Sequence, residues 1–272
     1  MVVLYPATTP GRPETIGLYT LEVALDAPIG AGEFPLVLIS HGTGGSPLVY
    51  RTLAHFLARQ GFVVGLPQHH GNHRDDNTWQ GTPRNLEARP RHLRLAIDFL
   101  FAAPWLAASL MPDTVGLIGH SLGGYTALAL AGGRPTALPH EPANELPLSI
   151  PTTSDDRVRA LVLLAPATPW YQAAGALREV RIPVLLLTAE RDEFTPDFHA
   201  QIVLNGVADR RQVTHRVIKN AGHYSFLSPF PLARVSPAFP PSQDPPGFDR
   251  ARFNDELNAD VAAFLRRELL RH

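Results

Sequence analysis

One short segment constrains this chain more than any other, a serine between two glycines where a predicted strand meets a predicted helix. The segment GHSLG (119–123) follows an apolar run at 115–118 and precedes a helical pattern at 122–131. A strand-to-helix turn this tight exposes the serine at the carboxyl edge of a sheet, and the glycines permit close backbone approach. The pattern predicts that Ser121 is a nucleophile and that the Leu122 N–H stabilises the oxyanion formed on attack.

Short apolar runs alternate with helical patterns along most of the chain. The predicted strands lie at 18–25, 36–39, 62–66, 115–118, 158–164, 182–187 and 213–218, and the predicted helices at 47–60, 86–103, 122–131 and 253–270. This alternation predicts an α/β fold with a doubly wound, mostly parallel sheet of about eight strands and helices on both faces. We expect one domain over residues 1–272, with proline-rich cap segments at 134–151 and 227–248.

Composition excludes several classes of function. The 272 residues include no cysteine, which excludes disulfides, zinc–thiolate sites and cysteine nucleophiles. The net charge of -1 argues against non-specific binding of nucleic acid. No apolar stretch reaches the about 18 residues of a membrane span. No secretory signal is evident, so we expect a cytoplasmic protein.

A second glycine-rich segment, HGTGG (41–45), follows the predicted strand at 36–39. Acyl transfer needs a second backbone donor opposite the nucleophile, and a loop after an earlier strand supplies it. We assign that donor to the Thr43 N–H, with Gly44 as the alternative, and place Gly42 beside the substrate. His41 is expected to support this loop through hydrogen bonds and not to act as the base.

The same segment does not fit a phosphate-binding loop. The dinucleotide fingerprint is broken, because Pro47 stands where its third glycine belongs. A Walker motif needs a lysine, and Lys219 is the only lysine of the chain. We therefore expect no cofactor.

A serine nucleophile needs a histidine as base and a carboxylate to orient it, in the chain order serine, acid, histidine. His223 is the predicted base, because it lies in a loop just after the last predicted strand. The other histidines after Ser121 lie in less suitable places: His140, His199, His215 and His272.

The acid is expected just after the predicted strand at 182–187. The segment TAERDE (188–193) offers three carboxylates, and we choose Asp192 because it lies a short loop beyond the strand. Glu190 is closer to the strand, and Glu193 or Asp197 is suited to begin a helix.

The segment QHHGNHRDD (68–76) holds three histidines and two aspartates. Such a cluster suits zinc or calcium, but a pocket wall and a solvated loop are the competing interpretations. We predict no metal. The side chains expected to contact substrate are His69, His70, Trp79, Trp170, Tyr224 and His120. The arginines Arg84, Arg89, Arg91 and Arg94 could attract an acidic substrate, but a solvated helix face is the favoured interpretation.

The segments at 34–72, 115–128 and 221–229, together with the closing helix, resemble the α/β-hydrolase superfamily. More narrowly, they are similar to the bacterial "predicted dienelactone hydrolase" group related to platelet-activating factor acetylhydrolase. The resemblance implies that Ser121 is the nucleophile, Asp192 the acid and His223 the base. It also implies that Thr43 and Leu122 are the oxyanion donors.

We therefore predict hydrolysis of a carboxylic ester through an acyl-enzyme. The same residues would serve a peptidase or amidase, a thioesterase or an acyltransferase, so the substrate is a small-molecule or peptide acyl compound. A non-catalytic binding protein of the same fold and a metal-dependent hydrolase are the less favoured interpretations. The sequence leaves open whether the protein is a homo-oligomer.

Overall fold

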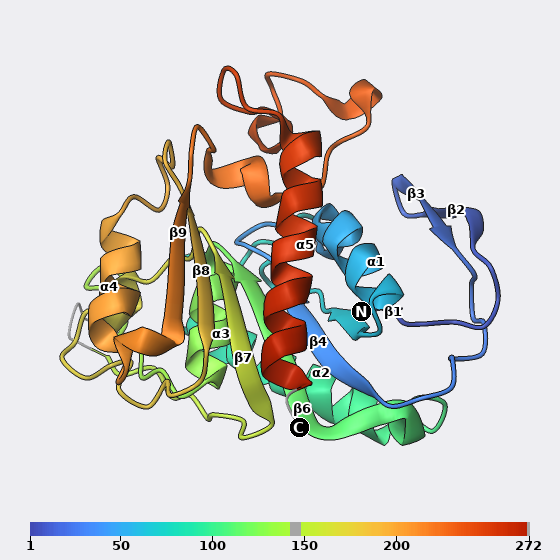
Figure 1. Cartoon of the computed structure of the whole chain (residues 1–272). Helices are drawn as coiled ribbons and strands as arrows, with labels where there is room; N and C mark the ends of the chain where they lie inside the picture. Colours follow the sequence, from blue (N-terminus) through green and yellow to red (C-terminus); the bar gives the residue numbers. More distant parts are fainter. Residues whose placement is uncertain (142–147, 271–272) are drawn as a thin grey trace.

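A seven-stranded sheet runs through the part of the chain that the computed structural model describes, residues 1–141 and 148–270 (Figure 1). Its strands, in spatial order, are β1 Val2–Leu4, β5 Val63–Leu66, β4 Phe34–Ser40, β6 Leu110–His120, β7 Val158–Leu164, β8 Val184–Ala189 and β9 Val213–Ile218. All neighbours pair in parallel except β1, which is antiparallel to β5. The predicted α/β fold is confirmed. Because these strands are parallel, the loops that follow β4, β6, β8 and β9 all lie at the same edge of the sheet.

The predicted strand at 18–25 does not join this sheet. It forms β3 (Tyr19–Val23), which pairs with β2 (Arg12–Ile16) in a separate antiparallel hairpin. Gly17, at φ 60°, turns the chain so tightly that β3 pairs with its neighbour in sequence. The main sheet therefore has seven strands among the described residues, where about eight were expected.

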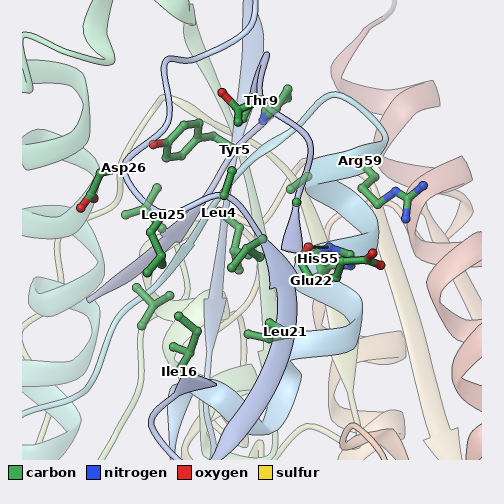
Figure 2. Close-up of a pocket in the computed structure, with 18 of the residues that line it drawn as sticks. Leu4, Tyr5, Thr9, Ile16, Leu21, Glu22, Leu25, Asp26, His55 and Arg59 are labelled. Carbon is green, nitrogen blue, oxygen red and sulfur yellow. Dashed lines mark hydrogen bonds between the residues drawn. The ribbon is translucent and has the colours of Figure 1, made fainter. Parts of the chain in front are cut away.

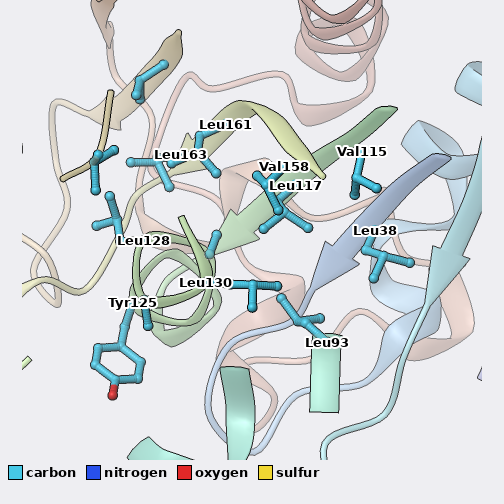
Figure 3. Close-up of a cluster of buried hydrophobic side chains, with 14 of the residues drawn as sticks. Leu38, Leu93, Val115, Leu117, Tyr125, Leu128, Leu130, Val158, Leu161 and Leu163 are labelled. Atoms are coloured by element: carbon cyan, nitrogen blue, oxygen red, sulfur yellow. The ribbon is translucent and has the colours of Figure 1, made fainter. Parts of the chain in front are cut away.

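Helices cover both faces of the sheet. The helices α1 (Arg51–Arg59) and α5 (Arg250–Leu269) pack on one face, and α2 (Pro83–Ala102), α3 (Leu122–Leu130) and α4 (Phe198–Gly206) pack on the other. Strand side chains alternate between the two cores: Leu36 and Leu38 face α2 and α3, whereas Val37 faces α1 and α5. Figure 3 shows the first of these cores, in which Leu128 and Leu130 of α3 lie on the side of the strand leucines and the Tyr125 ring points away from them.

The two proline-rich segments lie between different elements: 134–151 between α3 and β7, and 227–248 before α5. Residues 142–147 of the expected cap at 134–151 lie outside the described residues. The segment at 227–248 contains two short 3-10 helices, Leu232–Arg234 and Pro240–Ser242, and leads into the first turn of α5 (Figure 1). Arg250 ties it down through hydrogen bonds to the Pro241 and Gln243 carbonyls, each 2.8 Å long. Its role as a cap stays a prediction.

None of the described helices is long and apolar enough to cross a lipid bilayer.

Candidate active site

Ser121 lies on a strained turn between the end of β6 and the start of α3. Its backbone has φ 54° and ψ −123°, a region that residues other than glycine seldom adopt. Four backbone hydrogen bonds hold it there. The Ser121 N–H donates to the Leu164 and Ala165 carbonyls, each at 3.1 Å, and the Ser121 carbonyl accepts from the Gly124 N–H at 2.8 Å and the Ala167 N–H at 2.9 Å. A side chain at Gly123 would overlap the Ser40 carbonyl, so the helix start packs directly against the end of β4.

The loop after β4 lies beside this serine. A methyl group on Gly42 would sit 3.1 Å from Ser121 Cβ. The Thr43 and Leu122 N–H groups donate to no other described residue, whereas the Gly45 N–H donates to the Gly42 carbonyl at 3.2 Å. Both N–H groups are therefore free of hydrogen bonds in the part of the chain that the structure describes.

His41 supports this loop, as predicted. Its Nδ1 donates to the Gly42 carbonyl at 2.8 Å, and its Nε2 accepts from the His69 N–H at 3.2 Å. Burial, together with the charge of Arg89, lowers the pKa of His41 to about 3. The ring is therefore neutral at neutral pH, with the proton on Nδ1.

His223 and Asp192 meet across the ends of β8 and β9. His223 begins a 3-10 helix, His223–Phe226, and its Nδ1 lies 2.9 Å from Asp192 Oδ2 and 3.1 Å from Oδ1. Glu190, the alternative acid, instead accepts from the Asn220 N–H at 2.7 Å. The geometry thus selects Asp192 over Glu190 as the partner of the imidazole.

Asp192 is held as an anion by several donors. It accepts from the Phe194 N–H at 2.9 Å, the Thr195 N–H at 2.8 Å and the Thr195 hydroxyl at 2.7 Å. Burial alone raises the pKa of this carboxyl, but the hydrogen bonds from His223 and Thr195 outweigh it and lower the pKa to about 2. The carboxylate therefore stays ionised at any physiological pH.

His120 and His69, expected to contact substrate, are buried in hydrogen-bond networks. His120 Nε2 donates to the His223 carbonyl, and its Nδ1 accepts from the Tyr50 hydroxyl, both at 2.9 Å. His69 Nε2 lies 2.9 Å from Ser40 Oγ, and the His69 side chain is fully buried. Neither ring offers a substrate an exposed surface, so both expectations are corrected: these histidines hold the loops of the site.

Aromatic side chains surround His223. The Phe194 ring centroid lies 5.1 Å and the Tyr224 centroid 5.3 Å from the imidazole, and Phe194 is 61% exposed. Ser121 is half-buried, and its hydroxyl makes no hydrogen bond to any described residue. Phe194 and Tyr224 therefore form an apolar rim beside the buried imidazole.

His70, Trp79 and Trp170 are the remaining residues predicted to contact substrate, and their contact with it stays a prediction. The exposed His70 ring packs edge-on against the half-buried Trp79 ring, with their centroids 5.0 Å apart. The Arg84 guanidinium lies over the Trp79 ring, 3.9 Å from its centroid. Trp170 packs on Tyr125, with ring centroids 5.0 Å apart. In the described part of the chain, no three histidine, aspartate or glutamate side chains gather as metal ligands.

A cavity of about 660 Å³ lies away from these groups, between β1, the hairpin and α1 (Figure 2). Its lining includes Leu4, Leu21 and His55, and none of Ser121, Asp192 or His223. The serine site is thus distinct from this cavity.

Sequence reasoning missed Arg89. It was interpreted as part of a solvated helix face, but its side chain is completely buried, while Arg84, Arg91 and Arg94 are exposed as expected. The signal was available in the helical spacing, because Arg89 falls between the inward-facing Leu86 and Leu93.

Comparisons with known proteins find several similar sequences. A sequence model of the chlorophyllase family matches residues 19–140. The chain is 27% identical over 195 residues to a bis(hydroxyethyl) terephthalate hydrolase of Streptomyces coelicolor, covering 71% of this chain and 52% of that protein. It is 24% identical to cutinase est1 of Thermobifida alba (70% of this chain, 53% of the relative) and 26% identical to cutinase 2 of Thermobifida cellulosilytica (70% and 60%). The chain thus spans little more than half the length of these relatives.

Proposed function

The chain has the fold of the α/β-hydrolase superfamily, and from this premise we propose that it is a serine esterase that cleaves carboxylic esters through an acyl-enzyme. The observation that carries the proposal is the short contact between His223 Nδ1 and Asp192 Oδ2, 2.9 Å, on the same edge of the sheet as the strained Ser121. An imidazole oriented by a buried carboxylate is the base that a serine nucleophile requires.

In the proposed reaction, the Nδ1–H of His223 donates to Asp192, which leaves Nε2 free to take the proton of Ser121. Ser121 Oγ then forms a bond to the ester carbonyl carbon, and the carbonyl oxygen becomes an oxyanion bound by the Thr43 and Leu122 N–H groups. The tetrahedral intermediate collapses, the alcohol leaves with the proton from His223, and water repeats the sequence on the acyl-enzyme.

The unpaired hydroxyl of Ser121 is compatible with this mechanism. Catalytic hydrogen bonds are often long or absent without substrate and tighten only in the complex. The strained backbone supports the same role, because such strain persists only where the surrounding structure imposes it.

We propose an ester with an apolar acyl or alcohol group as substrate. The exposed Phe194 ring and the half-buried Tyr224 ring flank His223 and offer an apolar contact to whichever group lies over the imidazole. The similarity to two cutinases and a bis(hydroxyethyl) terephthalate hydrolase supports the same bond type. The narrower kinship with the dienelactone hydrolase-like group, the single domain and the cytoplasmic location also stay proposals.

The test is a panel of p-nitrophenyl esters of graded acyl length, with p-nitroanilide peptides and an acyl thioester alongside. Ester turnover that exceeds anilide turnover, and that disappears in Ser121→Ala, supports the proposal. Turnover of peptides or thioesters in preference to esters would move the assignment to a peptidase or thioesterase. Ester turnover that persists in Ser121→Ala would overturn the serine mechanism.

A further inference from the structure

Arg89 is the largest of the completely buried side chains, and its guanidinium lies behind the loop that carries Thr43. One terminal nitrogen donates to the His41 carbonyl in a very short contact and reaches Ser40 Oγ at 3.4 Å. The other terminal nitrogen donates to Asn72 Oδ1 at 2.6 Å, and Nε donates to Thr126 Oγ1 at 2.9 Å. A single side chain thus connects the end of β4, the loop after β5 and the helix that follows the nucleophile.

All acceptors of this buried cation are neutral. Among the described residues, no aspartate or glutamate pairs with Arg89. Burial lowers the pKa of Arg89 to about 9, so the group still carries its charge at neutral pH. Burying an arginine without a counter-ion is unfavourable. Arg89 is nevertheless buried where two loops and a helix converge.

Arg89 orients the first of two consecutive peptide groups, and His41 and Gly45 orient the second. In a trans peptide, the C=O of one residue and the N–H of the next point in opposite directions. Arg89 binds the His41 carbonyl, so the Gly42 N–H points away from Arg89. His41 Nδ1 and the Gly45 N–H bind the Gly42 carbonyl, so the Thr43 N–H points away from both.

Arg89 also reaches Thr43 through Asn72. The Asn72 amide accepts from Arg89 with Oδ1 and donates with Nδ2 to Thr43 Oγ1 at 2.9 Å. The same Nδ2 also donates to Asn77 Oδ1 at 2.6 Å, which fixes the Asn72 amide within its own loop. The guanidinium thus holds the His41 carbonyl directly and the Thr43 side chain through Asn72.

The helix that carries Arg89 is itself anchored to α3. Pro90 lacks an N–H, so within α2 it cannot donate to the carbonyl of Leu86 four residues earlier. The Tyr125 hydroxyl of α3 donates to that carbonyl at 3.0 Å instead. This contact and the Arg89–Thr126 hydrogen bond fix the guanidinium relative to the helix that begins beside Ser121.

We infer that Arg89 is a positioning residue for the oxyanion hole: it holds the Thr43 loop at a fixed distance from the nucleophile helix, so that the two N–H groups can meet one oxyanion. This inference rests on the proposed esterase function. Arg89 is expected to affect binding of the charged transition state, whereas Phe194 and Tyr224 bind the neutral ester.

The experiment compares wild-type protein with Arg89→Lys and Arg89→Met, each first checked for folding by circular dichroism and thermal melting. Lysine keeps the charge but cannot reach Asn72, Thr126 and the His41 carbonyl at once. For each variant, kcat and KM are measured on one p-nitrophenyl ester. The inhibition constant of an aryl trifluoromethyl ketone is measured as well, because Ser121 would add to that ketone to form an oxyanion.

We expect kcat to fall about tenfold in Arg89→Lys and on the order of 100-fold in Arg89→Met, with KM nearly unchanged. The ketone should bind more weakly by the same factors. Backbone amides at 42–45 should exchange hydrogen faster in both variants. Free guanidinium should restore part of kcat in Arg89→Met, which a general loss of stability would not allow.

Arg157→Lys is the matched control. Arg157 forms ion pairs with Asp155 and Asp98 where β7 begins, at the opposite edge of the sheet from Ser121. This variant should lose stability but keep the wild-type kcat and ketone affinity. Folded Arg89→Lys and Arg89→Met proteins with wild-type kcat and ketone affinity would overturn the inference alone. If the wild-type protein neither hydrolyses esters nor binds the ketone, the proposed function fails and the inference falls with it.

Discussion

His120 Nε2 donates a hydrogen bond of 2.9 Å to the carbonyl of His223, so the residue before the proposed nucleophile holds the backbone of the proposed base. The two residues are 103 positions apart in the chain. The Tyr50 hydroxyl donates to the other ring nitrogen at 2.9 Å, and burial lowers the pKa of His120 to about 3. A neutral, buried imidazole thereby links the ends of β6 and β9.

Replacing Tyr50 by phenylalanine should weaken this link without touching the substrate. His120 Nδ1 would then be buried without a donor, which costs about 1–3 kcal/mol of unfolding free energy. Urea unfolding should show that loss, with a smaller decrease in kcat and an unchanged KM. A Tyr50→Phe protein as stable as the wild type would show that this hydrogen bond contributes nothing.

Ser121 should be the only serine labelled by a fluorophosphonate probe. Ser121→Ala should abolish labelling and reduce kcat by several orders of magnitude, as loss of a triad nucleophile does. Peptide mapping by mass spectrometry locates the label, and Ser225→Ala is the control, because Ser225 is also near His223 but donates to Asp244 at 3.2 Å. Label on another residue would contradict the assignment.

Asp192→Asn should lower kcat by about 10⁴-fold, because an amide at this position favours the wrong tautomer of His223. Glu190→Gln is the matched control, two residues away and bound to Asn220 N–H, and it should keep nearly wild-type turnover. Steady-state kinetics on one ester compares the two variants. If Glu190→Gln were the more damaging change, the choice of acid would be wrong.

Phe194→Ala should raise KM for long or aromatic acyl esters and leave acetyl esters nearly unaffected. The ring is exposed and lies 5.1 Å from the imidazole, so its loss removes apolar contact area with little effect on folding. The acyl-length panel gives the comparison, and Phe198→Ala, which removes another exposed ring, is the control. Equal changes for short and long esters would refute a role in acyl selection.

Folding stability should decrease as the pH falls below about 6.5, the pKa of an unfolded histidine. Burial lowers the pKa of His41 and His120 to about 3, so the unfolded chain binds protons that the folded one does not. Each of these histidines then removes about 1.4 kcal/mol of stability per pH unit until its folded pKa is reached.

Asp192 contributes to acid lability only at lower pH. Its folded pKa of about 2 lies below the ordinary value of 3.8, so its stabilisation is complete above 3.8 and is lost as the pH falls toward 2. Urea unfolding at pH 7, 6 and 5 tests the histidine contribution separately. Stability that stays constant from pH 7 to 5 would contradict the buried, neutral state of His41 and His120.

Local patterns predicted much of the fold. The apolar runs at 158–164 and 213–218 coincide with β7 and β9, and the glycines around Ser121 correctly indicated the strand-to-helix turn. Period and turn chemistry are local properties, so they can be read from neighbouring residues. The short strand β1, with only three residues, carried too little pattern to be recognised.

The sequence by itself determined the residue types and order of the site: a serine on a glycine-flanked turn, then an acid, then a histidine after the last strand. Tertiary structure alone decided which carboxylate reaches His223, because Asp192 and Glu190 differ by two residues but end at different partners. It also decided that Arg89, His69 and His120 are interior, since burial and hydrogen bonding depend on segments that are distant in the chain. The physical reason is that side-chain chemistry is local, whereas desolvation and contact are properties of the packed whole.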